Sequence, residues 1–177
     1  MREDSGEIEA SMAGKLPQLM EPSMLKGAFH NHTTASDGTA SLEQMAQAAQ
    51  NLGWEFLGIA DHSQILQVAS GLSPDELISQ SAEVRALNES WSDKGVDFRL
   101  FHGNECDILP DGSLDYTDEE RSILDHVVGS VHQLPTWMKR DEMENTETLI
   151  RAIEEPSFTI LGHATGRILG GRDGFPV

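Results

Sequence analysis

Histidines and one glutamate recur along the chain in a pattern that indicates metal chemistry. The series consists of His30, His32, His62, Glu105, His132 and His163. Neutral imidazole and carboxylate groups suit Zn, Mn or Fe as ligands. A tetrahedral ion takes about four ligands, so a series of this size predicts two to three divalent ions. Such a cluster favours hydrolysis, because one ion activates water while a neighbour holds the leaving oxygen.

Each member of the series stands where a predicted β-strand ends. The intervals from His30 through His62, Glu105 and His132 to His163 are about 30 to 40 residues, roughly the length of one βα unit. The carboxyl ends of the strands in a βα barrel lie at one edge, and the active site assembles there. Alternate residues of an extended segment point to one side, so His30 and His32 can face the same ion. A lone histidine is more often structural than a ligand. A structural role for the whole series, however, would require five coincidences of position.

Other polar residues near these strand ends are further candidates. Asp37 lies in the loop over the same edge and can add a metal ligand, and Glu105 has two oxygens with which to bridge two ions. Asp61, next to His62, is either an acceptor behind the ligands or a strand cap. Arg167 can clamp a phosphate bidentately, although a surface or ion-paired arginine is an almost equal alternative. The predicted catalytic residues are Glu105, His132 and Arg167.

The remaining residues with reactive or aromatic side chains have structural interpretations. His102 and His126 lie off the common edge and are interpreted as structural. Cys106 should point away from the Glu105 side as a small buried residue. Trp137 is a packing residue that can alternatively border a substrate. The acidic stretch at 107–120 is interpreted as a solvated loop, because it lacks the spacing of an EF-hand calcium site.

Strands and helices alternate along the chain and predict an α/β fold with a parallel sheet or barrel. The predicted strands are residues 25–30, 54–60, 96–106, 124–131 and 157–162. The predicted helices begin at Ser41, Ser73 and Arg140, the last with Met143, Leu149, Ile150 and Ile153 facing inward. Residues 1–26, which include a possible short helix at 6–12, read as a linker or arm before a domain at 27–177. A full barrel needs seven or eight βα units, so five predict an incomplete one.

Composition excludes several classes of protein. The 177 residues include 30 acidic and 12 basic side chains, a net charge of −18, so binding of nucleic acid needs intervening cations. No apolar run approaches the roughly 20 residues of a membrane span, and the N-terminus has no apolar signal core. The single cysteine excludes an internal disulfide framework and favours a cytoplasmic location.

The motifs around these residues resemble the PHP (polymerase and histidinol phosphatase) domain. The opening motifs read HNHTTASDG at 30–38 and GIADHS at 58–63. Three later segments resemble the PHP domain of bacterial family X DNA polymerases in particular: GNECDIL at 103–109 with GSLDY at 112–116, LDHVVGSVH at 124–132, and LGHATGR at 161–167. The arm, REDSGEIEA at 2–10, is similar to the segment that joins polymerase and PHP domain in that family.

The resemblance implies a distorted seven-stranded βα barrel, here incomplete, with a trinuclear metal site. Its ligand positions match His30, His32, His62, Glu105, His132 and His163. It also implies phosphoesterase chemistry, typically a Mn-dependent 3′–5′ exonuclease and end-processing activity on DNA 3′ ends. The sequence departs from the family in two respects: it has no polymerase domain, and the closing Asp-x-His motif is absent before Val177.

Three functional hypotheses therefore stay open. The first is a metal-dependent phosphoesterase acting on DNA 3′ ends as part of a family X polymerase. The second is a non-catalytic PHP fragment that binds metal as a structural or interaction module. The third is a small-molecule phosphatase of the histidinol-phosphate type. An incomplete barrel leaves an open edge strand, so a dimer or a partner chain is expected to cover it.

Overall fold

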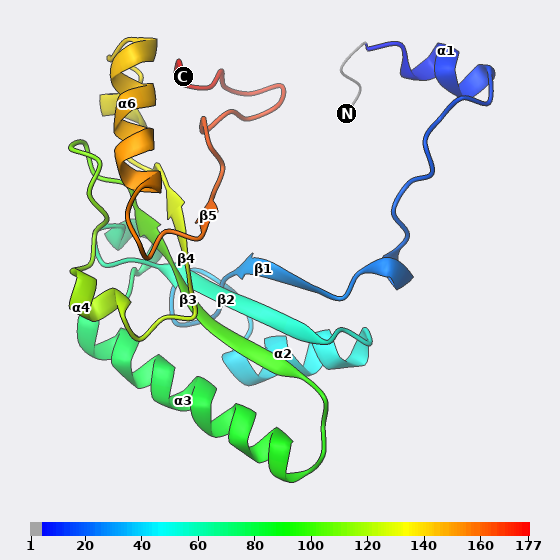
Figure 1. Cartoon of the computed structure of the whole chain (residues 1–177), viewed down its shortest axis with the longest axis vertical. Coiled ribbons are helices and arrows are strands. Elements are labelled where there is room, and N and C mark those ends of the chain that lie inside the picture. Colours follow the sequence, from blue (N-terminus) through cyan, green and yellow to red (C-terminus); the bar gives the residue numbers. More distant parts are fainter. Residues whose placement is uncertain (1–4) are drawn as a thin grey trace.

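A computed structural model describes residues 5–177 and contains one five-stranded parallel sheet (Figure 1). The strands are β1 (Gly27–Asn31), β2 (Phe56–His62), β3 (Arg99–Asp107), β4 (His126–Ser130) and β5 (Ile160–Leu161). Their order in the sheet is their order in the chain, and every neighbouring pair is parallel. Consecutive βα units produce this arrangement. The predicted α/β fold, an incomplete βα barrel, is confirmed.

The strands begin later than the sequence pattern predicts, because turns occupy the first predicted residues. Gly53 adopts a left-handed φ of +74°, and β2 starts only at Phe56. The last strand is the shortest, with Ile160 opposite Val128 and Leu161 opposite Gly129 as its sheet partners. Just before it, the amide of Phe158 donates to Glu155 in a turn. All five predicted strands nevertheless exist.

Helices connect the strands and cover one face of the sheet. They are α2 (Leu42–Asn51), α3 (Pro74–Asp93), α4 (Asp118–Arg121), α5 (Leu134–Trp137) and α6 (Glu142–Ile153), with a 3-10 turn η2 at Gln67–Ala69. Ser41 and Ser73 each close a capping box at the start of α2 and α3, which explains why those starts were predictable. Ahead of β1, α1 (Glu7–Met12) and the 3-10 turn η1 (Pro22–Met24) lie on an extended segment away from the sheet (Figure 1).

The predicted inward face of α6 is confirmed for Leu149 and wrong for its other three residues. Met143, Ile150 and Ile153 are exposed, and the buried side of the helix carries Asn145, Thr148, Leu149 and Ala152. Both buried polar side chains donate hydrogen bonds: Asn145 Nδ2 to the carbonyls of Trp137 and Pro176, and Thr148 Oγ1 to the carbonyl of Glu144. Hydrogen bonds to the loops that pack on α6 therefore decide its orientation, and apolar residues alone do not reveal them.

Two apolar clusters form the core between the helices and the sheet. One joins α2 and α3 to the helix-facing residues of β2 and β3: Leu42, Ala46, Ala49, Leu57, Ile59, Val84, Phe98 and Leu100. The other surrounds Cys106, Val127, Trp137 and Phe175 near the later strands. On the opposite face of the sheet, the ring of Phe29 packs against Phe56, Phe101 and His126. The side chains of each strand thus alternate between the helix layer and this inner face.

The sheet is curled, although β1 and β5 do not pair within the described residues. His30 in β1 and His163, just after β5, come from opposite edges of the sheet. Their ring centroids are only 6.1 Å apart. The curl therefore brings the ends of the first and last strands together and places the predicted site at one mouth of the half-barrel.

Candidate metal centre

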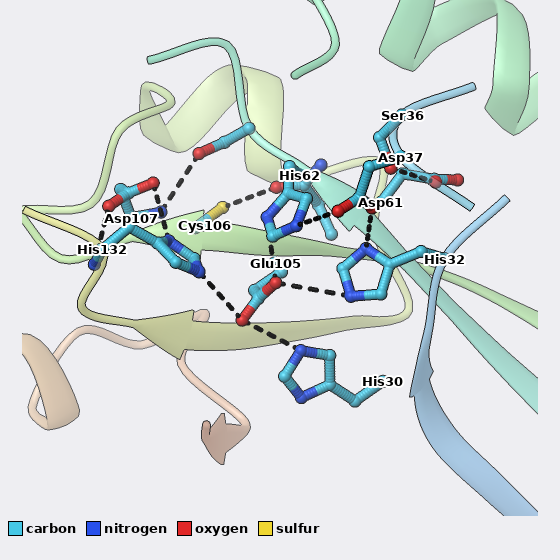
Figure 2. A network of polar contacts seen from close by, with 12 residues as sticks. His30, His32, Ser36, Asp37, Asp61, His62, Glu105, Cys106, Asp107 and His132 are labelled. Atoms are coloured by element: carbon cyan, nitrogen blue, oxygen red, sulfur yellow. Dashed lines mark hydrogen bonds and ion pairs between the residues drawn. The ribbon is translucent and has the colours of Figure 1, made fainter. Parts of the chain in front are cut away.

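Glu105 occupies the centre of the predicted site. Its side chain is 1% exposed, and imidazole nitrogens of five histidines surround its two oxygens. Figure 2 shows four of these rings, those of His30, His32, His62 and His132. The nitrogen-to-oxygen distances are 2.9 Å for His30, 3.0 Å for His62 and His163, and 3.5 Å for His32 and His132. Five predicted ligands from four separate segments thus converge on the sixth.

The geometry at this centre fits a group of metal ligands better than a hydrogen-bonded network. Glu105 Oε1, His32 Nδ1 and His62 Nδ1 are buried and have no hydrogen-bond partner of acceptable geometry. Buried polar atoms are normally satisfied, so lone pairs that converge without pairing indicate a site for cations. Three groups have ligand atoms within 4.8 Å of one another: His30, His32 and Glu105; His32, Asp37 and His62; and His62, Glu105 and His132. His163 approaches the same Glu105 oxygen as His30.

Electrostatics also concentrates negative charge at Glu105. Burial alone raises the pKa of Glu105, but the imidazoles of His132, His163, His30 and His62 beside its oxygens outweigh burial and hold the pKa well below its usual range. A buried carboxylate that stays ionised is the donor that a divalent cation requires. At His32, by contrast, burial is the largest influence and lowers the pKa, so this imidazole is neutral and able to coordinate.

The backbone at His30 and His32 differs from the simple alternation that predicted their common direction. His30 has a φ of +66°, and the pairing of β1 with β2 shifts register between Ala28 and Asn31. A left-handed conformation costs an L-residue roughly 1–2 kcal/mol. Both imidazoles face Glu105 as predicted, but an irregularity of the strand re-aims them.

Asp37 lies where the sequence suggested a further ligand. Its carboxylate oxygens are 3.6 Å from His32 Nδ1 and 3.5 Å from His62 Nε2, and half of its side chain is exposed. It is the exposed member of the three groups of ligands, and a loop rather than a strand carries it. Its position therefore depends on what holds that loop.

Asp61 does not join the cluster. It is fully buried and accepts hydrogen bonds from Thr33, Ser36 and Gln80. Asp61 was predicted to be either a hydrogen-bond acceptor behind the metal ligands or a strand cap. Its four hydrogen bonds agree with the first of these roles.

Asp107 is a residue that sequence reasoning missed. The acidic stretch 107–120 was interpreted as a solvated loop, but Asp107 is fully buried at the end of β3. Its Oδ2 lies 3.0 Å from His132 Nδ1, and its Oδ1 accepts from the His132 amide. The signal was available, because Asp107 lies two residues after Glu105 and points to the same side of the strand.

The contact with Asp107 controls the protonation of His132. Burial alone lowers the pKa of His132, but hydrogen bonds and charge from Asp107 and Glu105 raise it to about 9. Carboxylates behind ligating histidines commonly fix the tautomer and orientation of the ring.

Arg167 lies beside the cluster rather than within it. It lines a cavity of about 340 Å³ together with His132, His163 and Arg172, and Val131, Leu134 and Ile168 supply its apolar wall. Arg172 is anchored, since its Nε and Nη2 both donate to the carbonyl of Gly166. A cationic wall next to two predicted ligands suits a phosphate ester.

The residues interpreted as structural lie away from the cluster. Burial lowers the pKa of His102, and it lowers that of His126 to about 4, so both rings are neutral. Cys106 is fully buried on the helix side, where burial raises the pKa of its thiol. Trp137 is fully buried against Phe175, which leaves it no contact with a substrate.

Comparison with known proteins decides the family. The sequence profile described as "PHP domain" matches residues 28–174. The chain belongs to the PHP domain family.

Relatives of this PHP domain include both polymerases and phosphatases. It is 38% identical over 160 residues to the "DNA polymerase/3'-5' exonuclease PolX" of Bacillus subtilis (strain 168), across 90% of this chain and 27% of that protein. It is 32% identical over 154 residues to a "Probable phosphatase" of Clostridium botulinum (strain Langeland), across 84% of this chain and 55% of that protein. The chain thus spans about a quarter of the first relative and about half of the second.

A solved structure shows the same fold. It is described as a "putative histidinol phosphatase" from Listeria monocytogenes and superposes with a TM-score of 0.51 at 18% identity. The match covers 60% of this chain and 45% of that one. None of the helices in residues 5–177 combines the length and hydropathy needed to cross a membrane.

Proposed function

We propose that this PHP domain is a metal-dependent phosphoesterase that acts at DNA 3′ ends as part of a family X polymerase. One observation carries the hydrolytic part: five imidazoles surround a single ionised carboxylate, Glu105, and Asp37 lies beside two of those imidazoles. The likeness to the B. subtilis polymerase supports the DNA substrate, and the arm at 1–26 is the proposed connection to a polymerase domain. The proposed location is the reducing cytoplasm, because the lone thiol of Cys106 is buried and needs no disulfide partner.

The residues of the centre divide the chemical tasks among them. His30, His32, Asp37, His62, Glu105, His132 and His163 would hold two to three divalent ions, Zn, Mn or Fe. Such ions lower the pKa of bound water and offset the charge of a phosphate. Glu105 places negative charge at the middle of the cluster, and Asp107 holds His132 through its Nδ1. Arg167, on the wall of the adjacent cavity, would bind a phosphate oxygen.

Divalent ions also reconcile the DNA substrate with the charge of the chain. At −18 the protein repels a polyanion, whereas ions at the mouth of the half-barrel attract one locally. The open edge of the sheet is the proposed contact for a second copy or a partner chain.

The test is Mn²⁺-dependent release of nucleotides from a 3′-recessed DNA duplex, with metal content measured on the same preparation. The matched variant is His132→Ala, which removes one ligand from a partly exposed position. We expect a loss of at least about a hundredfold in rate, the scale on which removal of one catalytic group acts. Undiminished release by His132→Ala would refute the proposed active site.

A phosphatase acting on small monoesters is the second candidate, favoured by the phosphatase descriptions of the Clostridium relative and the Listeria structure. Parallel assays with DNA and with histidinol phosphate separate the two. Bound metal with neither activity would indicate the third candidate, a metal-binding fragment without catalysis.

A further inference from the structure

Asp61 is saturated with hydrogen bonds although it adjoins a predicted metal ligand. Its Oδ1 accepts from the amide of Thr33 at 2.7 Å and from Ser36 Oγ at 2.5 Å. Its Oδ2 accepts from Thr33 Oγ1 at 2.8 Å and from Gln80 Nε2 at 2.7 Å. A carboxylate has about four lone-pair sites, so Asp61 has none left for a cation.

Three of these four bonds hold the loop that carries Asp37. Within that loop the amides of Ser36 and Gly38 donate to the carbonyl of Thr33, and the amide of Ala35 donates to its hydroxyl. Thr33 is therefore the point from which the loop is built, and Asp61 anchors Thr33 through both its backbone and its side chain. The loop also packs closely, since a Cβ on Gly38 would come within 2.5 Å of the His32 carbonyl oxygen.

The fourth bond connects this anchor to the helix layer. Gln80 of α3 donates to Asp61 through Nε2, while its Oε1 lies 3.3 Å from His102 Nε2 in β3. This pairing orients the amide, because the donating end must face the carboxylate. All three side chains are buried, so the anchor is fixed to two neighbouring elements and does not move with the loop.

We propose that Asp61 is a positioning residue that determines whether the His32, Asp37 and His62 group is complete. It acts on Asp37 through Thr33 and Ser36 and touches neither substrate nor ion. Each of the other two groups shares one histidine with this group but has Glu105 in place of Asp37, and Glu105 is placed by β3 and not by the loop. Loss of the anchor should therefore remove one ion and leave the others. The inference rests on the metal binding in the proposed function, though not on any hydrolytic activity.

The main test is Asp61→Asn, which keeps the shape but replaces one acceptor oxygen with a donor that faces other donors. Two quantities are measured: metal bound per chain after loading with Mn²⁺ and dialysis, and hydrogen exchange of the amides at 33–40 in metal-free protein. We expect one metal equivalent fewer than in the unaltered protein. We also expect exchange at 33–40 to be about tenfold faster or more, with exchange in β3 unchanged.

Ser36→Ala and Thr33→Val each remove one hydroxyl donor to Asp61 without leaving a buried charge unpaired. Both should change the same two readouts in the same direction by smaller amounts, and they decide the question if Asp61→Asn does not fold. Asn145→Ala is the stability control, because it removes two hydrogen bonds of α6 and none of those that hold the loop. It should lower the unfolding temperature and leave the metal content unchanged.

Full metal content with unchanged exchange at 33–40 would overturn the inference. Loss of all the metal in parallel with global stability would overturn it as well, since it would show a general structural role. The exchange readout uses metal-free protein, so it still tests the loop anchor if the unaltered chain binds no metal and the proposed function fails.

Discussion

His126 offers a direct test of how burial controls ionisation in this fold. Its ring is 4% exposed, it contacts Phe29 edge-on, and neither ring nitrogen has a hydrogen-bond partner in the described structure. Burial lowers its pKa from 6.5 to about 4; Asp125 opposes that shift, and His102 and His30 add to it. The folded state therefore keeps His126 neutral at a pH where the unfolded state binds a proton.

The sign and size of the effect follow by linkage. The unfolded chain binds the extra proton, so stability is unaffected above about pH 7 and is lost as the pH falls from 6.5 towards 4. Between pH 7 and pH 5 these two pKa values correspond to about 2 kcal/mol of unfolding free energy. His126→Phe keeps an aromatic ring against Phe29 and removes the ionisable group. We expect this variant to lose about 2 kcal/mol less than the unaltered protein over the same interval.

The assay is urea unfolding of metal-free protein at pH 7 and pH 5. The change in unfolding free energy between the two pH values is compared for the variant and the unaltered protein. His102 and the other titrating groups are common to both proteins, so their contributions cancel in the difference. His126→Leu, a smaller apolar replacement, controls for packing: it changes stability at both pH values but should show the same reduced pH dependence as His126→Phe. If either variant matched the pH dependence of the unaltered protein, the reasoning from burial would be refuted.

Two other predictions concern the metal centre. Asp107→Asn should weaken metal binding by about tenfold to a hundredfold, because Asn cannot accept from His132 with a full negative charge. A competition titration against a chromogenic chelator measures the metal affinity. The control is Asp111→Asn, on the exposed part of the same acidic stretch, which should leave the affinity unchanged. Removal of metal with a chelator should lower stability by about 2.7 kcal/mol for each bound ion, relative to protein in free metal at a hundred times the dissociation constant. Thermal unfolding with and without Mn²⁺ measures this difference, and an unchanged midpoint would contradict the assignment of the centre.

Much of the candidate site was predictable because it lies at strand ends. Local hydrophobic runs locate strands, and the residue that follows each run must then emerge at one edge of a parallel sheet. His62, Glu105, His132 and His163 were placed together by this argument, and the structure brings them around one carboxylate. Capping boxes at Ser41 and Ser73 fixed the helix starts for a similarly local reason.

Other features depended on contacts between segments distant in the sequence. The buried side of α6 follows from hydrogen bonds between Asn145 and residues of two other segments, which no apolar period reveals. The burial of Asp107 depends on its packing under His132, so composition placed it wrongly in a solvated loop.

The sequence alone therefore determined the alternation of strands and helices, the family, and the predicted ligands at one edge of the sheet. These are properties of local pattern, since strand period and unit length decide which end of the sheet a side chain reaches. The tertiary structure decided how those side chains are aimed. The left-handed backbone at His30, the support of His132 by Asp107 and the anchoring of the Asp37 loop by Asp61 each require two or more segments to pack together. Pairing of neighbouring strands brings those segments within hydrogen-bonding distance, and the curl of the sheet adds the approach of His163 to His30.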